Sequence, residues 1–367
     1  MDVLLSKQKA PLVVVLAIAI VAGGCSSGSS PSASAAPSVA ASIDPTASYP
    51  SKSGSLPSVT FAQSVPQLSF APFEIAQNMN FFGYEGVKLQ FIQLQSGATS
   101  LQAMESGSID LVDSASTEVA TAAAKGLDFE AIENTIMMTL QFCVSKDWAQ
   151  QHKVTASSTI QQKMAAMKGA TIGITGPGAV SDTATRYLLK KYGNLNPDTD
   201  TRIIQVGGAA AIPGALDAGQ IQGFLLSPPA CGQTKNGMVL VDPSQLPEFQ
   251  NYTHEVVYGS KKWLTANKDL ATKVATAVAM GNNFILKYPA AALALLEKDF
   301  PKVAPSVVET SFNDTIKPQI KPDGKFDASM WQNTMQVFAD MGIVKQALDT
   351  SEGGVWTNAY IGDASVR

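Results

Sequence analysis

Apolar and polar positions alternate with two different periods along the chain from residue 58 onward. Val87, Leu89 and Phe91 alternate with polar residues, as they do in a half-buried strand. Segments with apolar residues at helical spacing lie between such runs and end at glycines. The first half is predicted to contain strands at 59–61, 87–91, 109–112 and 127–132, and helices over 72–82, from Thr99 or Ser100 to Gly107, and from 114–117 to Gly126. Strands that alternate with helices of about ten residues indicate βαβ units and a parallel sheet.

The same alternation begins again after residue 170. The predicted strands are 171–174, 202–206 and 221–226, and the predicted helices are 179–192 and 209–218, with glycines after both. Met104–Asp110 and Leu216–Gln222 share one pattern, in which a helix ends at Gly and a buried strand follows. This weak repeat indicates two similar α/β lobes. From Lys261 onward the pattern is helical, over 269–286, 290–297 and 329–341.

The amino-terminal segment has the pattern of an export signal. Lys7 and Lys9 precede an apolar run over 12–21, which is shorter than the roughly 20 residues of a membrane span. The small residues at 22–24 stand directly before Cys25 and resemble the lipobox of bacterial lipoproteins. This resemblance implies removal of residues 1–24 and lipid attachment to Cys25. The alternative is an ordinary secretory signal with a cysteine there by chance.

A linker and three further segments complete the predicted organisation. After Cys25, the stretch to residue 57 is dominated by Ser, Ala, Pro and Gly, and we expect it to be disordered. As a flexible coil it would reach roughly 30 Å. The predicted segments of the body are lobe I over 58–140, lobe II over 141–254, and a return to lobe I with C-terminal helices over 255–367.

Composition excludes several classes of function. The 367 residues suggest about two domains. The net charge of −4 and the presence of only three arginines argue against nucleic-acid binding by phosphate neutralisation. Two histidines and three cysteines do not have the spacing of a Cys/His zinc site. We therefore expect no metal, no cofactor and no nucleic-acid partner. Cys143 and Cys231 could form a disulfide or remain two buried thiols.

Five segments in order resemble the extracytoplasmic solute-binding proteins of ABC importers. The resemblance is to the nitrate, sulfonate, taurine and bicarbonate binders, also called NMT1-like or SsuA/THI5-like, and it covers about residues 58–300. The matching segments are Ile75–Phe82, Gln95–Ser100, Met104–Asp110, Met167–Ile174 and Leu216–Ile221. The resemblance implies an α/β fold of the type II periplasmic-binding-protein kind, with two lobes, each a mostly parallel sheet flanked by helices. It also implies a ligand cleft between the lobes and crossing strands, here at 139–145 and 255–258.

Turns at the starts of helices are the candidate ligand site. Free backbone N–H groups at helix N-termini suit small polar or anionic ligands, and Ser, Thr and Gly permit close approach. The same residues also serve as ordinary helix caps and turns, and Arg186 is expected to be a surface charge rather than an anion clamp. The candidate ligand-binding residues are Gln67, Ser69, Phe70, Gly97, Thr99, Ser100, Ser114, Ser116, Thr117, Gly178, Ser181, Gly208 and Ser227.

The function that the resemblance implies is binding without catalysis. A monomeric, membrane-anchored lipoprotein would capture a small solute by hinge closure and deliver it to the permease and ATPase subunits of an importer. A binder of a thiamine-precursor pyrimidine is the alternative within the same fold. The fold could also belong to a pyrimidine-synthase enzyme, whose Cys-rich motif is absent here, or to a sensor or adhesin.

Overall fold

The computed structural model describes residues 47–367. The predicted signal peptide, the lipidation site at Cys25 and most of the predicted linker lie outside the described residues. The last part of that linker is ordered against the body, contrary to expectation. Tyr49 is buried, its N–H donates to Met79 O at 2.9 Å, and Arg367 stacks on its ring. Within residues 47–367, no helix has both the length and the apolar character needed to cross a bilayer.

The first five-stranded sheet forms lobe I, with the order β2-β1-β3-β10-β4. Strand β10 runs antiparallel to both of its neighbours, while β1, β2 and β3 are parallel to one another. The strands are β1 (Ser58–Gln63), β2 (Lys88–Gln93), β3 (Leu111–Ala115), β4 (Phe129–Met137) and β10 (Thr253–Ser260). Four strands therefore run in one direction, as a mostly parallel sheet requires.

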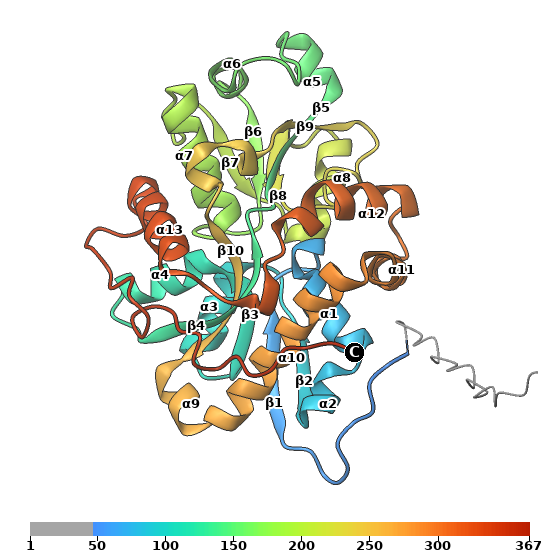
Figure 1. The fold of residues 1–367 in the computed structure, drawn as a ribbon. Helices are drawn as coiled ribbons and strands as arrows, with labels where there is room; N and C mark the ends of the chain where they lie inside the picture. Colours follow the sequence, from blue (N-terminus) through green and yellow to red (C-terminus); the bar gives the residue numbers. More distant parts are fainter. Residues whose placement is uncertain (1–46) are drawn as a thin grey trace, which may run out of the picture. The chain divides into compact units, whose positions relative to one another are not determined.

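Helices cover both faces of this sheet because its strands alternate apolar residues between the two faces. Phe61 and Leu111 pack with α1 and α10, whereas Ala62 and Val112 pack with α3 and α4. Figure 1 shows α1 and α10 beside β1 and β2, with α3 and α4 further along the sheet. The helices of this lobe are α1 (Ala71–Asn78), α2 (Phe81–Glu85), α3 (Gly97–Glu105), α4 (Ser116–Ala124), α9 (Lys261–Ala266), α10 (Lys268–Lys287) and α11 (Pro289–Asp299).

Lobe II repeats the topology of lobe I. Its sheet has the order β7-β6-β8-β5-β9, and β5 is the strand that runs antiparallel to its neighbours. The strands are β5 (Gln141–Ser145), β6 (Thr171–Ile174), β7 (Arg202–Gln205), β8 (Gly223–Leu226) and β9 (Gly237–Val241). The helices are α5 (Lys146–Gln151), α6 (Ile160–Ala165), α7 (Val180–Gly193) and α8 (Ile212–Asp217). Two matching α/β lobes confirm the fold class that the sequence predicted.

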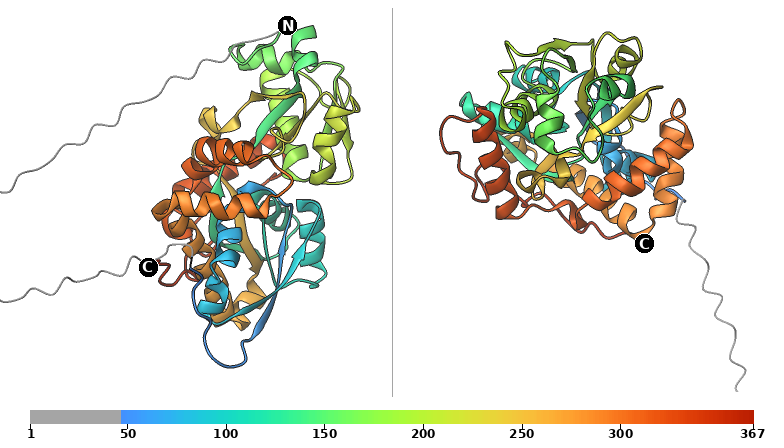
Figure 2. Two further views of the ribbon diagram at one scale, coloured as in Figure 1. Left: turned by 90° about the vertical axis from the view of Figure 1, so that its right-hand side faces the viewer. Right: turned by 90° about the horizontal axis from the view of Figure 1, so that it is seen from above.

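Two connections join the lobes. Residues 138–140 lead from β4 into β5, and residues 242–252 lead from β9 back into β10. The predicted crossing at 255–258 was placed too late, because those residues already pair with β3 and β4 inside the lobe I sheet. Each lobe thus receives, as its one antiparallel strand, the strand that arrives from the other lobe. Figure 2 shows the two lobes stacked, with the crossings between them.

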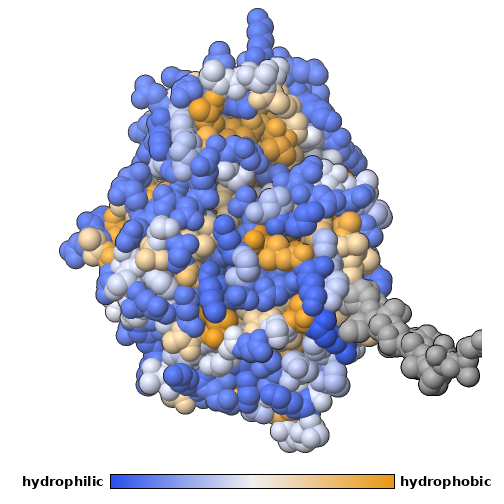
Figure 3. Space-filling view, viewed as in Figure 1, coloured by the Kyte–Doolittle hydropathy of each residue, from blue (hydrophilic) through white to orange (hydrophobic). Residues whose placement is uncertain are grey.

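The C-terminal helices add contacts between the lobes. Helix α13 (Ala328–Met341) packs against α7 of lobe II and against α4 and β10 of lobe I. Asn333 Nδ2 donates to Glu248 O at 2.9 Å, and the Thr253 N–H donates to Thr334 Oγ1 at 3.1 Å. Helix α12 (Pro305–Ser311) lies beside the segment that follows β8. On the face shown in Figure 3, hydrophilic residues separate the hydrophobic surface into patches.

Several predicted element boundaries were wrong. The helix predicted over 72–82 is two helices, because Asn80 adopts a left-handed conformation between α1 and α2. Gly86, not Gly83, follows the second of them with φ 86°. Helix α3 begins at Gly97 and is capped by Ser96, not by Thr99 or Ser100, since the Ser96 hydroxyl accepts a hydrogen bond from the Thr99 N–H. Gly107 and Gly219, in contrast, both end their helices in the left-handed region, as the repeat predicted.

Cys143 and Cys231 form a disulfide, which decides between the two states that the sequence left open. It ties β5 to the segment that follows Pro228 and Pro229, and the two Cα atoms are 5.6 Å apart. The disulfide therefore links β5 to the segment after β8, close to residues 138–140, which form one of the two connections to lobe I.

Candidate functional site

The two lobes meet along the rims of the cleft between them. A Cβ atom on Gly208 would lie 3.0 Å from Gln95 Oε1, and a Cβ atom on Gly176 would lie 3.5 Å from Ser96 Oγ. Both glycines belong to turns of lobe II, and both partners precede α3 of lobe I. The lack of a side chain at Gly208 therefore allows its close approach to Gln95, whereas a Cβ atom at Gly176 would make ordinary contact with lobe I.

A small cavity lies inside the closed cleft. It is lined by lobe I, lobe II and the connections, and its open volume of about 20 Å³ has room for one or two waters. The lining residues are Ser64, Val65, Gln67, Gly97, Ser114, Ala115, Glu118, Leu140, Thr175, Ala179, Val180, Ser181, Leu226, His254 and Glu255. Any larger solute requires the lobes to lie further apart than they do here.

A bulge in β10 brings two adjacent side chains to the cavity. Neighbouring residues of a regular strand point to opposite faces, but the pairing of β10 with β4 shifts on both sides of Glu255. As a result, His254 and Glu255 both line the cavity. Both side chains are buried, with exposed fractions of 0% and 3%.

A chain of polar contacts runs from lobe II to lobe I through these two residues. Ser227 Oγ lies 2.8 Å from Thr139 Oγ1, which lies 3.1 Å from His254 Nδ1. His254 Nε2 lies 3.4 Å from Glu255 Oε1, and Ser69 Oγ donates to that oxygen at 3.3 Å. Burial lowers the pKa of His254 to about 3, so the imidazole is neutral. His254 Nε2 and Glu255 Oε2 have no hydrogen-bond partner among residues 47–367.

Glu118 is the second carboxyl group in the cavity. It lies in the first turn of α4, and its Oε2 accepts from Thr117 Oγ1 at 3.3 Å and from Ser114 Oγ at 3.4 Å. Its Oε1 has no partner within the described part of the chain. Burial raises the pKa of Glu118 to about 8 and that of Glu255 well above its usual value. Nearby carboxyl groups, including Glu118 and Asp113, contribute to the shift of Glu255.

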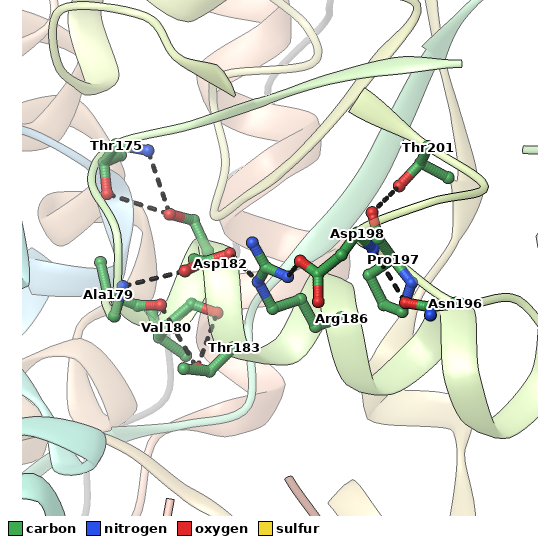
Figure 4. A network of polar contacts seen from close by, with 12 residues as sticks. Thr175, Ala179, Val180, Asp182, Thr183, Arg186, Asn196, Pro197, Asp198 and Thr201 are labelled. Carbon is green, nitrogen blue, oxygen red and sulfur yellow. Dashed lines mark hydrogen bonds and ion pairs between the residues drawn. The ribbon is translucent and has the colours of Figure 1, made fainter. Parts of the chain in front are cut away.

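The turn before α7 is held by its own side chains (Figure 4). Ser181 Oγ accepts from the Thr175 N–H at 3.1 Å, and Asp182 Oδ2 accepts from the Gly178 N–H at 2.9 Å. Arg186 Nε donates to Asp182 Oδ1 at 2.6 Å, and Arg186 Nη1 donates to Asp198. The Arg186 guanidinium is thus paired with two carboxylates. It supports the turn through Asp182 and does not line the cavity.

Side chains of the protein also occupy the other predicted helix starts in lobe I. In α3, the Ser96 hydroxyl accepts from the Thr99 N–H at 3.2 Å, and the Thr99 hydroxyl accepts in return from the Ser96 N–H. In α4, the carboxylate of Glu118 lies in the first turn, where it also interacts with its own backbone N–H. An anion entering the cleft would therefore find acceptor oxygens already present at these N-termini.

Some of the residues predicted for the site line the cavity and others support it. Gln67, Gly97, Ser114 and Ser181 line it. The supporting residues contact its lining or its rims: Ser69 (to Glu255), Thr117 (to Glu118), Ser227 (to Thr139), Thr99 and Ser100 (to Ser96 O), Gly178 (to Asp182) and Gly208 (against Gln95).

Two predicted residues lie elsewhere. Phe70 is fully buried in an apolar cluster with Phe224 and Ile212. Ser116 Oγ donates to Thr253 O at 2.7 Å and so fixes α4 against β10. Their positions follow from packing, which the turn pattern of the sequence does not specify.

Sequence reasoning missed the three ionisable residues of the cavity, Glu118, His254 and Glu255. A signal for two of them was present, since His254 and Glu255 stand within an otherwise apolar strand. Charged residues are rarely fully buried without a partner or a role, so that pattern marks a site. Among the described residues, no Lys or Arg lines the cavity. Those residues also contain no group of three His, Cys, Asp or Glu side chains placed to hold a metal.

A wider groove lies outside the cavity and is also bordered by both lobes. Its open volume is about 630 Å³, and Gln67 lines both spaces. The carboxyl groups of Glu74 and Asp299 and the ammonium of Lys302 border the groove. Gln67 therefore stands between the closed cavity and a space open to solvent.

Known structures share this fold. A protein from Bordetella bronchiseptica RB50 is 22% identical over 83% of this chain and 95% of its own, with a TM-score of 0.68. The nitrate-binding protein NrtA from Synechocystis PCC 6803 is 16% identical over 82% and 85%, with a TM-score of 0.66. The alkanesulfonate-binding protein SsuA from Xanthomonas axonopodis pv. citri, bound to MOPS, is 17% identical over 80% and 96%, with a TM-score of 0.62.

Family comparison agrees with the fold. No curated protein sequence matches the chain. The sequence profile of the NMT1-like family matches residues 57–298, which include all strands of both lobes and most of the helices. The chain belongs to the NMT1-like family.

Proposed function

We propose that the protein is the extracytoplasmic solute-binding component of an ABC importer. It would bind a small solute between its lobes and deliver it to the permease and ATPase subunits. The observation that carries this proposal is the cavity, which both lobes and the connections line and in which buried polar atoms lack partners. Such atoms cost free energy unless a ligand or water pairs with them. Two of the named structural neighbours are binding proteins, one for nitrate and one for alkanesulfonate.

Hinge closure is the proposed mechanism. The lobes are joined by residues 138–140 and 242–252, and their rims meet at Gly176 and Gly208. A solute that contacts both lobes would stabilise the closed form over the open one, because it makes its full set of contacts only there. The permease would then distinguish the loaded, closed protein from the open one.

The proposal does not include a pyrimidine-synthase activity. The three cysteines of the sequence do not form the Cys-rich motif of that branch of the fold.

The solutes to test first are those that the family resemblance implies. These are nitrate, bicarbonate, taurine and alkylsulfonates, with thiamine-precursor pyrimidines as the alternative class. Titration calorimetry of the purified chain would report binding, and small-angle scattering would report closure as a fall in the radius of gyration. Binding of at least one solute with closure is expected. If none binds and the radius of gyration stays constant, the proposal fails.

A lipid anchor at Cys25 is part of the same proposal. It rests on the apolar run and the small residues that precede this cysteine in the sequence. Expression in a bacterium fed a labelled fatty acid would give a labelled, membrane-bound protein. Cys25→Ala would remove the label and release the protein into the soluble fraction. Equal labelling of the variant would contradict the anchor.

A further inference from the structure

We propose that the solute carries a protonated amine, an amidine or another N–H-donating group, and that this group binds between Glu118 and Glu255. The inference rests on the proposed function and names the chemical class of its ligand. It differs from the anion-binding site that the helix N-termini suggested, in which backbone N–H groups would hold a negative charge.

The first argument is the set of hydrogen-bonding atoms left free in the cavity. Glu118 Oε1 and Glu255 Oε2 have no partner within residues 47–367, although the two side chains are only 2% and 3% exposed. An ionised carboxylate only accepts hydrogen bonds. Two such acceptors from different elements, α4 and β10, match a ligand group with several N–H donors.

The second argument concerns the donors that an anion would need. The Gly178 and Thr175 N–H groups before α7 already donate to Asp182 and Ser181. The Thr99 N–H of α3 donates to Ser96. Arg186, in α7, forms ion pairs with two aspartates, Asp182 and Asp198. An anion bound at these three N–H groups would therefore have to displace oxygens of the protein, whereas an N–H donor at the free carboxyl oxygens would not.

The third argument is charge. Among the described residues, no Lys or Arg lines the cavity to balance Glu118 and Glu255. Isolated buried carboxylates are costly, so burial keeps them protonated in the empty protein. A cationic group placed between them would favour the ionised forms. Its binding near neutral pH should then release protons to solvent.

Matched ligand pairs give the sharpest test. Taurine and ethanesulfonate differ in the ammonium group, and 4-amino-2-methylpyrimidine and 2-methylpyrimidine differ in the amino group. Methylammonium and guanidinium chloride probe the donor group alone, and sodium nitrate and bicarbonate probe anions without it. The ligand with N–H donors should bind at least ten-fold more tightly than its partner. Calorimetry in two buffers of different ionisation enthalpy should show proton release.

Isosteric variants test the two carboxyl groups. Glu118→Gln and Glu255→Gln each remove one acceptor and the charge, and should weaken binding of the preferred N–H ligand by about 10- to 100-fold, the range of a charge-assisted hydrogen bond. Glu133→Gln is the matched control. Glu133 is equally buried and also has a free oxygen, but that oxygen lies beside Gly324 and not in the cavity. Thermal melting of each variant would show that it folds.

The outcomes separate the two proposals. If nitrate, bicarbonate or ethanesulfonate binds best, with no proton release and with unchanged affinity in both glutamine variants, the solute-binding role stands and this inference is overturned. Protonated carboxyl groups would then act as donors to an anion. If no probe binds and scattering shows no closure, both the inference and the proposed function fail.

Discussion

The carboxyl group of Glu118 packs against the α-carbon of Gly97, where a Cβ atom would lie 2.7 Å from Glu118 Cδ. A side chain at Gly97 would therefore force the carboxyl group out of its position in the cavity. Since Gly97 is the first residue of α3, alanine there suits the helix itself. Gly97→Ala should leave the fold intact and weaken solute binding about ten-fold or more, measured by calorimetry.

Gly214 provides the control for this prediction. It lies in α8, and nothing is within 4 Å of a Cβ atom built there. Gly214→Ala should keep the wild-type affinity and raise the unfolding free energy by about 0.5–1 kcal/mol, since alanine favours a helix. Equal losses of affinity in both variants would show that Gly97 does not act through Glu118.

The rim of the cleft gives a second prediction. A Cβ atom on Gly176 would make ordinary contacts with Ser96 Oγ at 3.5 Å and Ala98 Cβ at 3.8 Å. Gly176→Ala should therefore close normally, whereas the branched side chain of Gly176→Val would press on lobe I. We expect the valine variant to show a larger radius of gyration with saturating solute and a faster release of it. If scattering curves of the two variants coincide, this rim does not limit closure.

The disulfide between Cys143 and Cys231 should contribute to stability through the length of chain that it closes. The two residues are 88 positions apart, and cross-links over such loops reduce the entropy of the unfolded chain. The double variant Cys143→Ala, Cys231→Ala should lose about 2–5 kcal/mol of unfolding free energy in urea. A reducing agent should lower the stability of the wild type and leave the double variant unchanged. Wild-type protein that melts identically with and without reductant would contradict the prediction.

Local signals in the sequence were sufficient to predict the two-lobe fold. Glycines such as Gly107 and Gly219 end helices in the left-handed region, and both take φ near 70° here. Strand β6 begins and ends where the apolar pattern predicted. These features depend on neighbours in the chain, so a single sequence reports them.

The residues that line the cavity could not be predicted, because contacts between residues far apart in the sequence bring them together. Glu118 became a site residue because Gly97, from another helix, leaves room for its carboxyl group. His254 and Glu255 share the cavity because of a bulge, whose position follows from pairing with β4. Conversely, Phe70 was predicted for the site because it follows the first strand, but tertiary packing buries it. The start of α3 was predicted at Thr99 or Ser100 and not at Gly97, because the reciprocal cap between Ser96 and Thr99 was not predicted.

The buried carboxyl groups predict that stability falls as pH rises through neutrality. Burial raises the pKa of Glu118 from 4.5 to about 8 and that of Glu74 to about 7. Between the unfolded and folded values, the folded protein holds more protons than the unfolded chain, so its unfolding free energy decreases with pH. His254 has the opposite effect, because its pKa falls from 6.5 to about 3, but that effect ends above about pH 6.5.

Urea unfolding between about pH 6.5 and pH 8 therefore measures the effect of the carboxyl groups on stability without a contribution from His254. Glu118 alone should contribute a fall of about 1–2 kcal/mol in the unfolding free energy across this window, since one proton per pH unit corresponds to about 1.4 kcal/mol. Glu118→Gln should show a shallower dependence, because glutamine does not titrate. The exposed Glu105→Gln, which loses only a surface ion pair with Lys125, should keep the wild-type slope. A slope that is the same in all three proteins would mean that Glu118 is ionised in the folded state.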